Sequence, residues 1–372
     1  MKRQSRTADV LIVGAGIVGA ACAREFARQG LSVAVVESGA IGGGATAAAM
    51  GHLLVVDDAE FELSRRSCEL WDEWLAESPG NTAAAEHQRC GTIWIAADEE
   101  ELAEARRKNA WYAERGIACE LLDTAGLARL EPQLRPGLAG GLRVPSDARV
   151  FPPKAAARWL QEARAQIIHG EVVALDGHTL TLADGRQLWG ALVVVCAGLA
   201  SQRWLPHGWL RPKKGQLAIT QRGRDVRIQH ELVDLGYLKK AHLADEDSVA
   251  FNLQPRPGGQ ILIGSSRQPG RSDAAIDHEL LSRMLAEACA MLPALADASL
   301  LRCWTGLRPT SRDGLPLIGA HPALKRVWLA CGHEGMGITT SLATAELLVD
   351  LSLGREPRIA ASPFSPERLV AA

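Results

Sequence analysis

Short apolar runs alternate along the chain with stretches in which apolar residues recur at helical spacing, and this pattern predicts a mixed α/β fold. The runs at 10–13, 31–36 and 192–198 are apolar or small throughout, as is typical of parallel strands that are buried on both faces. Residues 17–29, between the first two runs, have helical spacing, and Gly30 follows them. The chain therefore begins with a predicted strand–helix–strand unit, whose sheet the run at 192–198 rejoins.

In the rest of the chain, stretches with helical spacing of apolar residues alternate with stretches that have strand patterns. Helices are predicted at 59–76, 98–115, 123–131, 154–166, 274–292 and 338–353. Strands are predicted at 92–96, 120–122, 137–144 (as a pair), 167–175, 179–182, 216–220, 228–238, 249–253, 260–264 and 327–330. Parallel pieces that enclose antiparallel blocks predict two interleaved domains, the first at 8–75, 145–205 and 300–372 and the second at 76–144 and 206–299.

Three glycines follow the first predicted strand at the spacing G-x-G-x-x-G. Gly14 permits a tight turn, Gly16 lets the backbone approach a pyrophosphate, and Gly19 lets the next helix pack closely on the strand. The N-terminus of that helix offers N–H groups and a positive dipole end to phosphate. Glu37 ends the second strand, where a carboxylate accepts hydrogen bonds from ribose hydroxyls. These features together predict a dinucleotide site, and a tight turn without a ligand is the alternative.

Two further loops are candidates for contact with a flat ligand. Residues 39–53 are nearly all small, so a backbone and a ligand can approach closely, and His52 is the only titratable side chain among them. A flexible loop, with a structural role for His52, is the alternative. The second loop, at 332–337, opens the helix predicted at 338–353 and so forms a potential anion site.

Composition and charge narrow the classes of function. The chain has 372 residues and a formal net charge of −2, so no global attraction to nucleic acid or to an anionic membrane is expected. Its eight cysteines form no C-x-x-C pair, which predicts reduced, mostly buried thiols and no metal site. The basic N-terminus and the apolar run after it imitate a secretory leader, but cleavage would remove the glycine motif. No apolar run reaches the roughly 18 residues of a membrane-spanning helix.

Taken in order, these motifs resemble those of the FAD-dependent amine oxidoreductases of the D-amino acid oxidase (DAO) type. Residues 10–37, 43–53 and 193–198 carry the resemblance, together with G-L-R-P at 306–309, D-G-L-P at 313–316 and G-H-E-G-M-G-I-T-T at 332–340. The blocks span nearly the whole chain in family order. Within the family, G-H-L at 51–53 and the last run are most similar to D-hydroxyproline dehydrogenase and to the FAD subunits of opine oxidase and hydrogen cyanide synthase.

The resemblance implies a Rossmann-like FAD-binding domain interleaved with an α+β substrate domain built on an antiparallel sheet. It places the adenine of FAD near Val172 and the isoalloxazine between the loops at 44–53 and 332–338. The positive end of the helix predicted at 338–353 would stabilise the negative charge of reduced flavin. The implied cofactor-binding residues are Gly14, Ala15, Gly16, Ile17, Val18, Gly19, Glu37, Ser38, Gly44, Ala45, Thr46, Gly51, His52, Leu53, Val172, Ala197, Gly198, Gly306, Gly335, Met336, Gly337, Ile338 and Thr339.

In this family the arginine of G-x-R-P often holds the substrate carboxylate, and that role transfers to Arg308. A guanidinium binds a carboxylate in bidentate fashion and so orients the α-carbon as well as adding affinity. The alternative is that Arg308 fixes its loop through Asp313. His333, Glu334 and His52 are implied as substrate or flavin contacts, with loop structure as their alternative.

One position departs from the family pattern. Glycine oxidase-like members carry a tyrosine on the strand before a P-R dipeptide, and the matching residue here is Asn252. The chain has two tyrosines, Tyr112 and Tyr237, of which the second lies on a neighbouring predicted strand. Asn252 is therefore included among the candidate substrate-site residues.

The reaction that the resemblance implies is oxidative deamination of a D-amino or imino acid, with cis-4-hydroxy-D-proline or D-proline as the leading substrate. Hydride would pass from the α-carbon to flavin N5, and electrons would pass on to a quinone or a partner subunit. The alternatives are a glycine- or sarcosine-type oxidase that uses oxygen, and an FAD subunit of a hetero-oligomeric complex like opine oxidase. An RNA-modifying role is disfavoured because no basic patch with interleaved aromatics is visible. A cytoplasmic protein, or one peripheral to the inner membrane, is expected, and covalent FAD attachment at Cys303 or His52 stays open.

Overall fold

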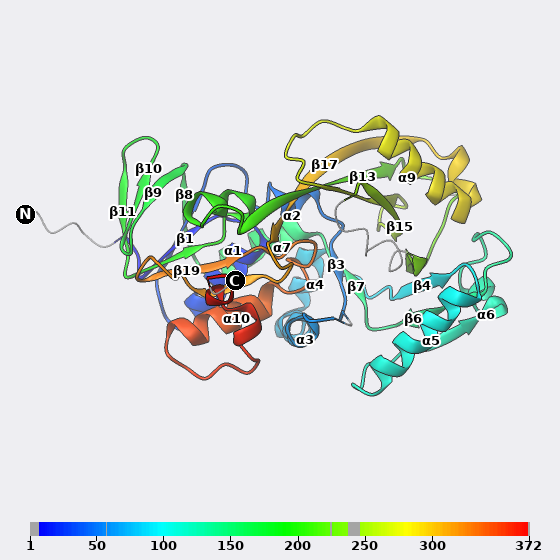
Figure 1. Ribbon diagram of the computed structural model, residues 1–372, viewed down its shortest axis with the longest axis horizontal. Coiled ribbons are helices and arrows are strands. Elements are labelled where there is room, and N and C mark those ends of the chain that lie inside the picture. The colour runs from blue at the N-terminus through cyan, green and yellow to red at the C-terminus, as the bar shows by residue number, and fades with distance from the viewer. Residues whose placement is uncertain (1–6, 57, 224, 237–245, 371–372) are drawn as a thin grey trace, which may run out of the picture. The chain divides into compact units, whose positions relative to one another are not determined.

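The computed structural model describes residues 7–56, 58–223, 225–236 and 246–370, and it divides into two compact units (Figure 1). Unit 1 is Met1–His87, Val150–Pro212 and Leu307–Ala372, and unit 2 is Gln88–Arg149 and Lys213–Gly306. The predicted boundary at 75/76 lies earlier than the observed one at 87/88. The reason is α4 (Pro79–Ala85), which packs against α3 (Phe61–Glu77) and α7 (Pro152–Glu162) and so belongs to unit 1.

Unit 1 is built on a six-stranded sheet in the described residues. Its strands are β1 (Val10–Val13), β2 (Val33–Glu37), β8 (Gln166–His169), β12 (Leu192–Val195), β18 (Leu317–Ala320) and β19 (Val327–Cys331). The order is β18-β19-β12-β1-β2-β8, with β1 in register between β2 and β12. All neighbouring pairs are parallel except β18–β19, which is antiparallel. The strand–helix–strand unit and the return of the later apolar run to its sheet are therefore confirmed.

The two faces of this sheet are covered by different layers. One is a small antiparallel sheet of β9 (Val172–Leu175), β10 (Thr179–Leu182) and β11 (Gln187–Trp189), which shares a core with Leu11 and Val13 of β1. The other layer contains α1 (Ile17–Arg28) and α10 (Ser341–Ser352), which pack against each other, and α1 also packs on α7. In Figure 1 the β9–β11 sheet and α10 lie to opposite sides of β1.

Several predicted boundaries in unit 1 are corrected. The run at 167–175 is two strands, because β8 pairs with β2 in the six-stranded sheet whereas β9 pairs with β10 in the small sheet. The helix predicted to start at 338 begins at Ser341, since residues 337–340 form turns in which the N–H of Thr340 bonds the carbonyl of Met336. The positive helix end therefore lies three residues further along than the sequence predicted.

Unit 2 contains most of an eight-stranded sheet in the described residues. The strand order is β17-β13-β16-β15-β14-β4-β6-β5, and β13 and β17 extend into the sequence of unit 1. The pairs β13–β16, β16–β15, β15–β14, β4–β6 and β6–β5 are antiparallel, whereas β14–β4 is parallel. The strands are β4 (Thr92–Ala96), β5 (Glu120–Asp123), β6 (Gly140–Val144), β13 (Leu210–Thr220), β14 (Glu231–Asp234), β15 (Ser248–Pro255), β16 (Ile261–Pro269) and β17 (Leu300–Ser311). The block at 137–144 is thus one strand rather than a predicted pair.

Aspartates begin the helices of unit 2, as their N-cap preference predicts. Asp98 accepts a hydrogen bond from the N–H of Glu101 at the start of α5 (Glu99–Ala113), and Asp277 accepts one from Leu280 in α9 (His278–Met291). α9 packs on β15 and β16 and closes the apolar core of this unit. The remaining elements are α2 (Ala45–Ala48), α6 (Thr124–Leu130), β3 (His52–Leu53), β7 (Ala148–Arg149) and the 3-10 helices at Gly198–Trp204, Pro293–Asp297, Ser362–Phe364 and Pro366–Leu369.

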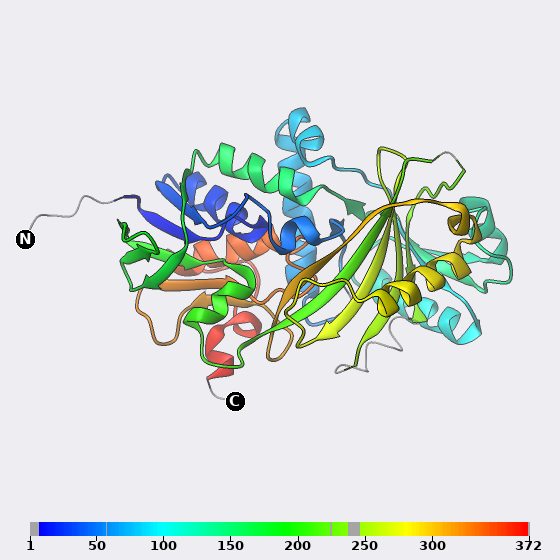
Figure 2. The same ribbon diagram turned by 90° about the horizontal axis from the view of Figure 1, so that it is seen from above.

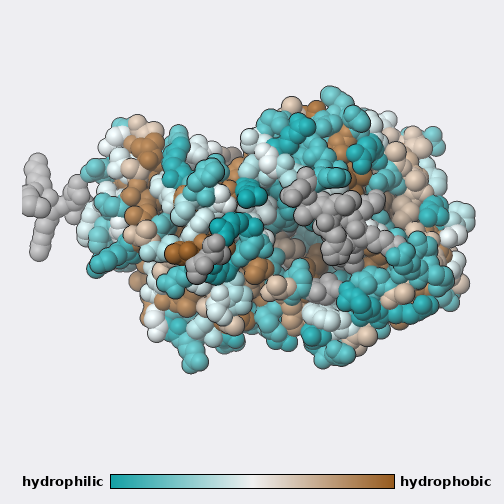
Figure 3. Space-filling model, in the orientation of Figure 1, coloured by the Kyte–Doolittle hydropathy of each residue, from teal (hydrophilic) through white to brown (hydrophobic). Residues whose placement is uncertain are grey.

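Apolar residues on the surface are scattered. Figure 3 shows teal and brown residues interspersed over the face that it draws. Within the described residues, no helix combines the length and apolar character needed to cross a membrane. All eight cysteines are free thiols, but only Cys22, Cys196 and Cys331 are buried, so the prediction of mostly buried thiols is wrong for the other five.

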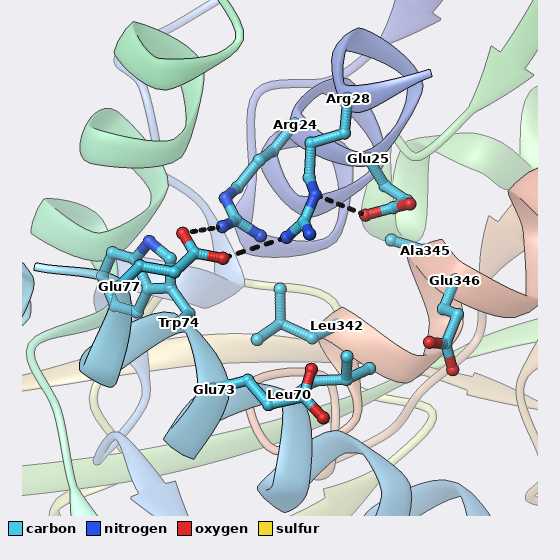
Figure 4. A pocket seen from close by; sticks show the side chains of 10 residues that line it. All are labelled: Arg24, Glu25, Arg28, Leu70, Glu73, Trp74, Glu77, Leu342, Ala345 and Glu346. Carbon is cyan, nitrogen blue, oxygen red and sulfur yellow. Dashed lines mark hydrogen bonds and ion pairs between the residues drawn. The ribbon is translucent and has the colours of Figure 1, made fainter.

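A crevice among α1, α3 and α10 is lined by charged and apolar side chains, and both of its arginines pair with glutamates (Figure 4). Arg24 donates to Glu77 at 2.5 Å and to Glu162 at 2.8 Å, while Arg28 bonds Glu77 at 3.1 Å. Arg24 is 93% buried as a residue, so these ion pairs compensate a charge that burial would otherwise penalise. We assign this crevice a structural role in joining three helices.

Candidate cofactor and substrate site

The glycine motif forms a turn that excludes side chains at two positions. The φ of Gly14 is +104°, and a Cβ there would lie 2.6 Å from the carbonyl oxygen of Cys196. A Cβ on Gly19 would lie 2.0 Å from the carbonyl oxygen of Gly14, which shows how closely α1 packs on the turn. Gly16 is the N-cap of α1 and has an ordinary φ of −68°. Its lack of a side chain leaves the backbone at the helix N-terminus open to close approach, as a pyrophosphate requires.

Two polar side chains converge on this turn. The carboxylate of Glu37 accepts hydrogen bonds from the N–H groups of Ala15 and Gly39, each at 2.7 Å, which fix its orientation at the end of β2. A carboxylate has about four acceptor positions, so capacity remains for ribose hydroxyls. Thr46 of α2 accepts from the N–H of Ile17 at 3.0 Å and so holds the small-residue loop against the start of α1. The cradle and these polar groups fit FAD.

The two glycine-rich loops meet in unit 1. The hydroxyl of Thr339 donates to the carbonyl of His52 at 2.9 Å. A Cβ on Gly337 would lie 3.9 Å from Val18 Cγ2, which places the second loop beside the first turn of α1. Gly51, with φ +92°, permits this path because a Cβ would lie 2.1 Å from the carbonyl oxygen of Val150. The structure thus brings the glycine turn and both loops together around one region.

Arg308 lies against the second loop. A Cβ on Gly335 would be 3.9 Å from Arg308 Cδ, and the N–H of Glu334 donates to the carbonyl of Pro309 at 2.9 Å. The alternative role, in which Arg308 fixes the loop through Asp313, does not match the structure. Asp313 instead forms a bidentate pair with Arg368, with N···O distances of 2.7 and 2.9 Å.

His333 points into the core rather than out of the loop. Its side chain is 3% exposed and its Nε2 shares a 3.0 Å hydrogen bond with Thr344 Oγ1 on α10. Burial lowers the pKa of His333 to about 4, so the ring is neutral at neutral pH. These contacts are those of a residue that anchors the loop, and we do not carry His333 forward as a substrate contact.

Acid should weaken the fold through His333. Its folded pKa is about 4 and its ordinary value is 6.5, so the unfolded chain binds the proton more readily between these values. Stability should therefore fall by about 3 kcal/mol as the pH falls through this window. Urea unfolding of the wild type and His333→Gln should show a stability difference that shrinks toward low pH. The exposed His207→Gln control should show no such trend, and a constant difference for His333→Gln would contradict the account.

Sequence reasoning overlooked Glu60, a buried carboxyl just before α3. Glu60 is 7% exposed and its Oε1 is buried without a hydrogen-bond partner among the described residues. Burial, with Asp58 and Glu334 nearby, raises the pKa of Glu60 to about 8. Its position in an amphipathic helical pattern carried no signal, because the loop that brings Glu334 near it is more than 270 residues away in the chain.

The other predicted residues are placed as follows. Val172 is buried on β9, and its carbonyl accepts a 2.7 Å hydrogen bond from Arg203. Ala197 and Gly198 follow β12, with the Cα of Ala197 3.0 Å from the Cβ position of Gly14. Asn252 and Gly306 belong to unit 2, where Asn252 lies on β15 opposite Val233 and Gly264. Tyr237 lies outside the described residues.

Comparison with known proteins agrees with this geometry. The profile of the family described as DAO, FAD dependent oxidoreductase, matches residues 9–351. The chain is 28% identical to a glycine oxidase of Geobacillus kaustophilus, over 97% of each chain, and 27% identical to the hydrogen cyanide synthase subunit HcnC of Pseudomonas aeruginosa, over 92% of each. The crystal structure of the Geobacillus kaustophilus glycine oxidase superposes with a TM-score of 0.85 at 26% identity, covering 97% of this chain and 98% of that one.

Proposed function

The chain belongs to the DAO family of FAD-dependent oxidoreductases, and we propose that it oxidises the CH–NH2 or CH–NH group of a D-amino or imino acid. The leading candidates are cis-4-hydroxy-D-proline and D-proline. The observation that carries the proposal is Arg308, whose side chain lies over the Gly335 backbone of the loop expected beside the isoalloxazine. A guanidinium there suits a substrate carboxylate.

Bound FAD supplies the acceptor for the hydride that leaves the substrate α-carbon. The residues of the chain contribute binding and orientation. Arg308 would hold the carboxylate and so limit the poses in which the α-hydrogen faces the cofactor. Thr339 and the backbone of His52 hold the two loops together. Burial lowers the pKa of His333 to about 4, so its ring is neutral at neutral pH, and its hydrogen bond to Thr344 anchors the loop.

Two alternative functions have specific support. The likeness to glycine oxidase favours an oxidase that acts on glycine or sarcosine and reduces oxygen to hydrogen peroxide. The likeness to HcnC favours an FAD subunit that works within a hetero-oligomer. Stoichiometric peroxide formation by the isolated chain would favour the first. Strong activity of the isolated chain with an artificial electron acceptor would rule out the second.

Anaerobic mixing of the FAD-loaded protein with a substrate panel tests the proposal. The panel contains D- and L-imino acids, D-amino acids, sarcosine, glycine and opines, and flavin absorbance reports reduction. We expect rapid bleaching by cis-4-hydroxy-D-proline or D-proline. Bleaching by glycine or sarcosine alone would replace the proposal with the oxidase alternative, and no bleaching by any compound would replace it with the hetero-oligomer alternative.

A further inference from the structure

The carboxyl of Glu60 is buried in a position where a carboxyl ordinarily has a partner. Glu60 is the N-cap residue of α3, yet its side chain makes no capping hydrogen bond. Its backbone is engaged normally, since the N–H donates to Asp58 Oδ1 at 2.8 Å and the carbonyl accepts from Ser64 at 2.8 Å. The backbone of Glu60 is therefore fixed by its neighbours, while Oε1 is buried with no donor from the residues that the structure describes.

The charges around this carboxyl are negative. Asp58 precedes it in the same segment, and Glu334 approaches from the loop at 332–337. Among the described residues, these are the charged groups that act on the Glu60 carboxyl, and both favour its protonated form. A cation bound here would be attracted by the two carboxylates. It would also favour the ionised form of the Glu60 carboxyl, because a nearby positive charge lowers the pKa of a buried acid.

Glu60 is linked to the proposed substrate site through the loop at 332–337. Glu334, which acts on it electrostatically, is tied through its N–H to the carbonyl of Pro309, next to Arg308. The following residue, Gly335, lies beneath the Arg308 side chain. The loop at 332–337 therefore contacts Arg308 through Gly335 and acts electrostatically on the Glu60 carboxyl through Glu334.

We propose that Glu60 is a specificity-determining residue that accepts a hydrogen bond from a cationic nitrogen of the substrate. This inference rests on the proposed function, because it assigns Arg308 to the substrate carboxylate and Glu60 to its amine. The site would then select amphoteric molecules over simple carboxylic acids. When the cation binds, the Glu60 carboxyl loses its proton to solvent, so binding at neutral pH releases up to one proton.

Calorimetry with unreactive ligands tests this inference on the FAD-loaded protein. α-Methyl-D-proline has a carboxylate and a cationic nitrogen but no α-hydrogen to lose. 1-Methylcyclopentane-1-carboxylate has the same shape with CH2 in place of the nitrogen. We expect the wild type to prefer the first ligand and to release a proton on binding it near neutral pH, as measured in two buffers with different ionisation enthalpies.

The variant Glu60→Gln should bind α-methyl-D-proline about 10- to 100-fold more weakly, because a hydrogen bond to a charged partner is lost. It should also lose the proton release, while its affinity for the carbocyclic ligand stays the same. Gln resembles the protonated acid, so the fold is retained. Glu62→Gln, at a 55%-exposed side chain two residues away, is the matched control and should behave as the wild type.

The outcomes distinguish failure of the role of Glu60 from failure of the proposed function. Equal affinity of the wild type and Glu60→Gln for α-methyl-D-proline, with unchanged proton release, would overturn the inference even if the substrate panel succeeds. A Glu60-dependent preference for the cationic ligand, combined with no oxidation of any amino acid, would uphold Glu60 and overturn the proposed function. 5-Aminopentanoate, whose amine is distant from its carboxylate, tests whether Glu60 binds an α-nitrogen or a distal amine. Tighter Glu60-dependent binding of that ligand would assign Glu60 to a distal amine instead of the α-nitrogen.

Discussion

Replacement of Arg308 by alanine should lower kcat/KM by about 30- to 5,000-fold, which corresponds to about 2–5 kcal/mol of transition-state binding. The physical reason is that the carboxylate of the substrate would lose its bidentate partner and its orientation at once. The rate of anaerobic flavin reduction, measured across substrate concentrations, gives the effect directly. Arg308→Lys should recover only part of it, because an ammonium keeps the charge but not the planar pair of donors.

Arg312→Ala is the matched control for this prediction. Arg312 is exposed and lies four residues further along the same segment, and its backbone N–H donates to the carbonyl of Trp209 regardless of its side chain. Its kcat/KM should stay at the wild-type value. An unchanged kcat/KM in Arg308→Ala would remove Arg308 from the substrate site.

Replacement of Gly19 by alanine should abolish retention of FAD. The added methyl group would lie 2.0 Å from the carbonyl oxygen of Gly14, so α1 has to move away from the turn to which we assign the phosphates of FAD. Forcing a methyl group into such a contact costs about 1–3 kcal/mol or more. We expect the purified variant to be colourless after gel filtration, with a flavin-to-protein absorbance ratio far below that of the wild type.

Gly223→Ala is the control for this second variant. Gly223 is exposed in unit 2, has no atom within 4 Å of its Cβ position and has no positive φ. It should bind FAD as the wild type does. If Gly19→Ala retained a full complement of FAD, the glycine turn would not be the part of the chain that holds the cofactor.

Local sequence patterns were sufficient to predict the elements whose structure depends on residues adjacent in the chain. The apolar runs at 10–13 and 192–198 predicted buried parallel strands, because a strand covered on both faces has no polar position to interrupt it. The spacing of Gly14, Gly16 and Gly19 predicted the tight turn, since the required φ and the close approach of α1 both exclude side chains. The DAO family followed from the order of such motifs along the chain.

The ends of helices and the contacts between distant segments could not be predicted from such local patterns. The parallel pairing of β14 with β4 joins strands more than 130 residues apart, and alternation of residues does not encode strand direction. The helix expected at 338 begins at Ser341, after turns at 337–340 in which the hydroxyl of Thr339 bonds the carbonyl of His52.

Among the side chains that matter most for chemistry, the sequence revealed only those that stand in a short motif. Arg308 was visible in a short motif, whereas the pairing of Asp313 with Arg368, the burial of His333 against Thr344 and the isolation of Glu60 all depend on contacts across long stretches of chain. A sequence records which residues can ionise, but burial and neighbouring charges set whether they do. Residue type and spacing therefore predicted the glycine turn expected to bind FAD, whereas the burial that shifts the pKa values of His333 and Glu60 arises only in the folded chain.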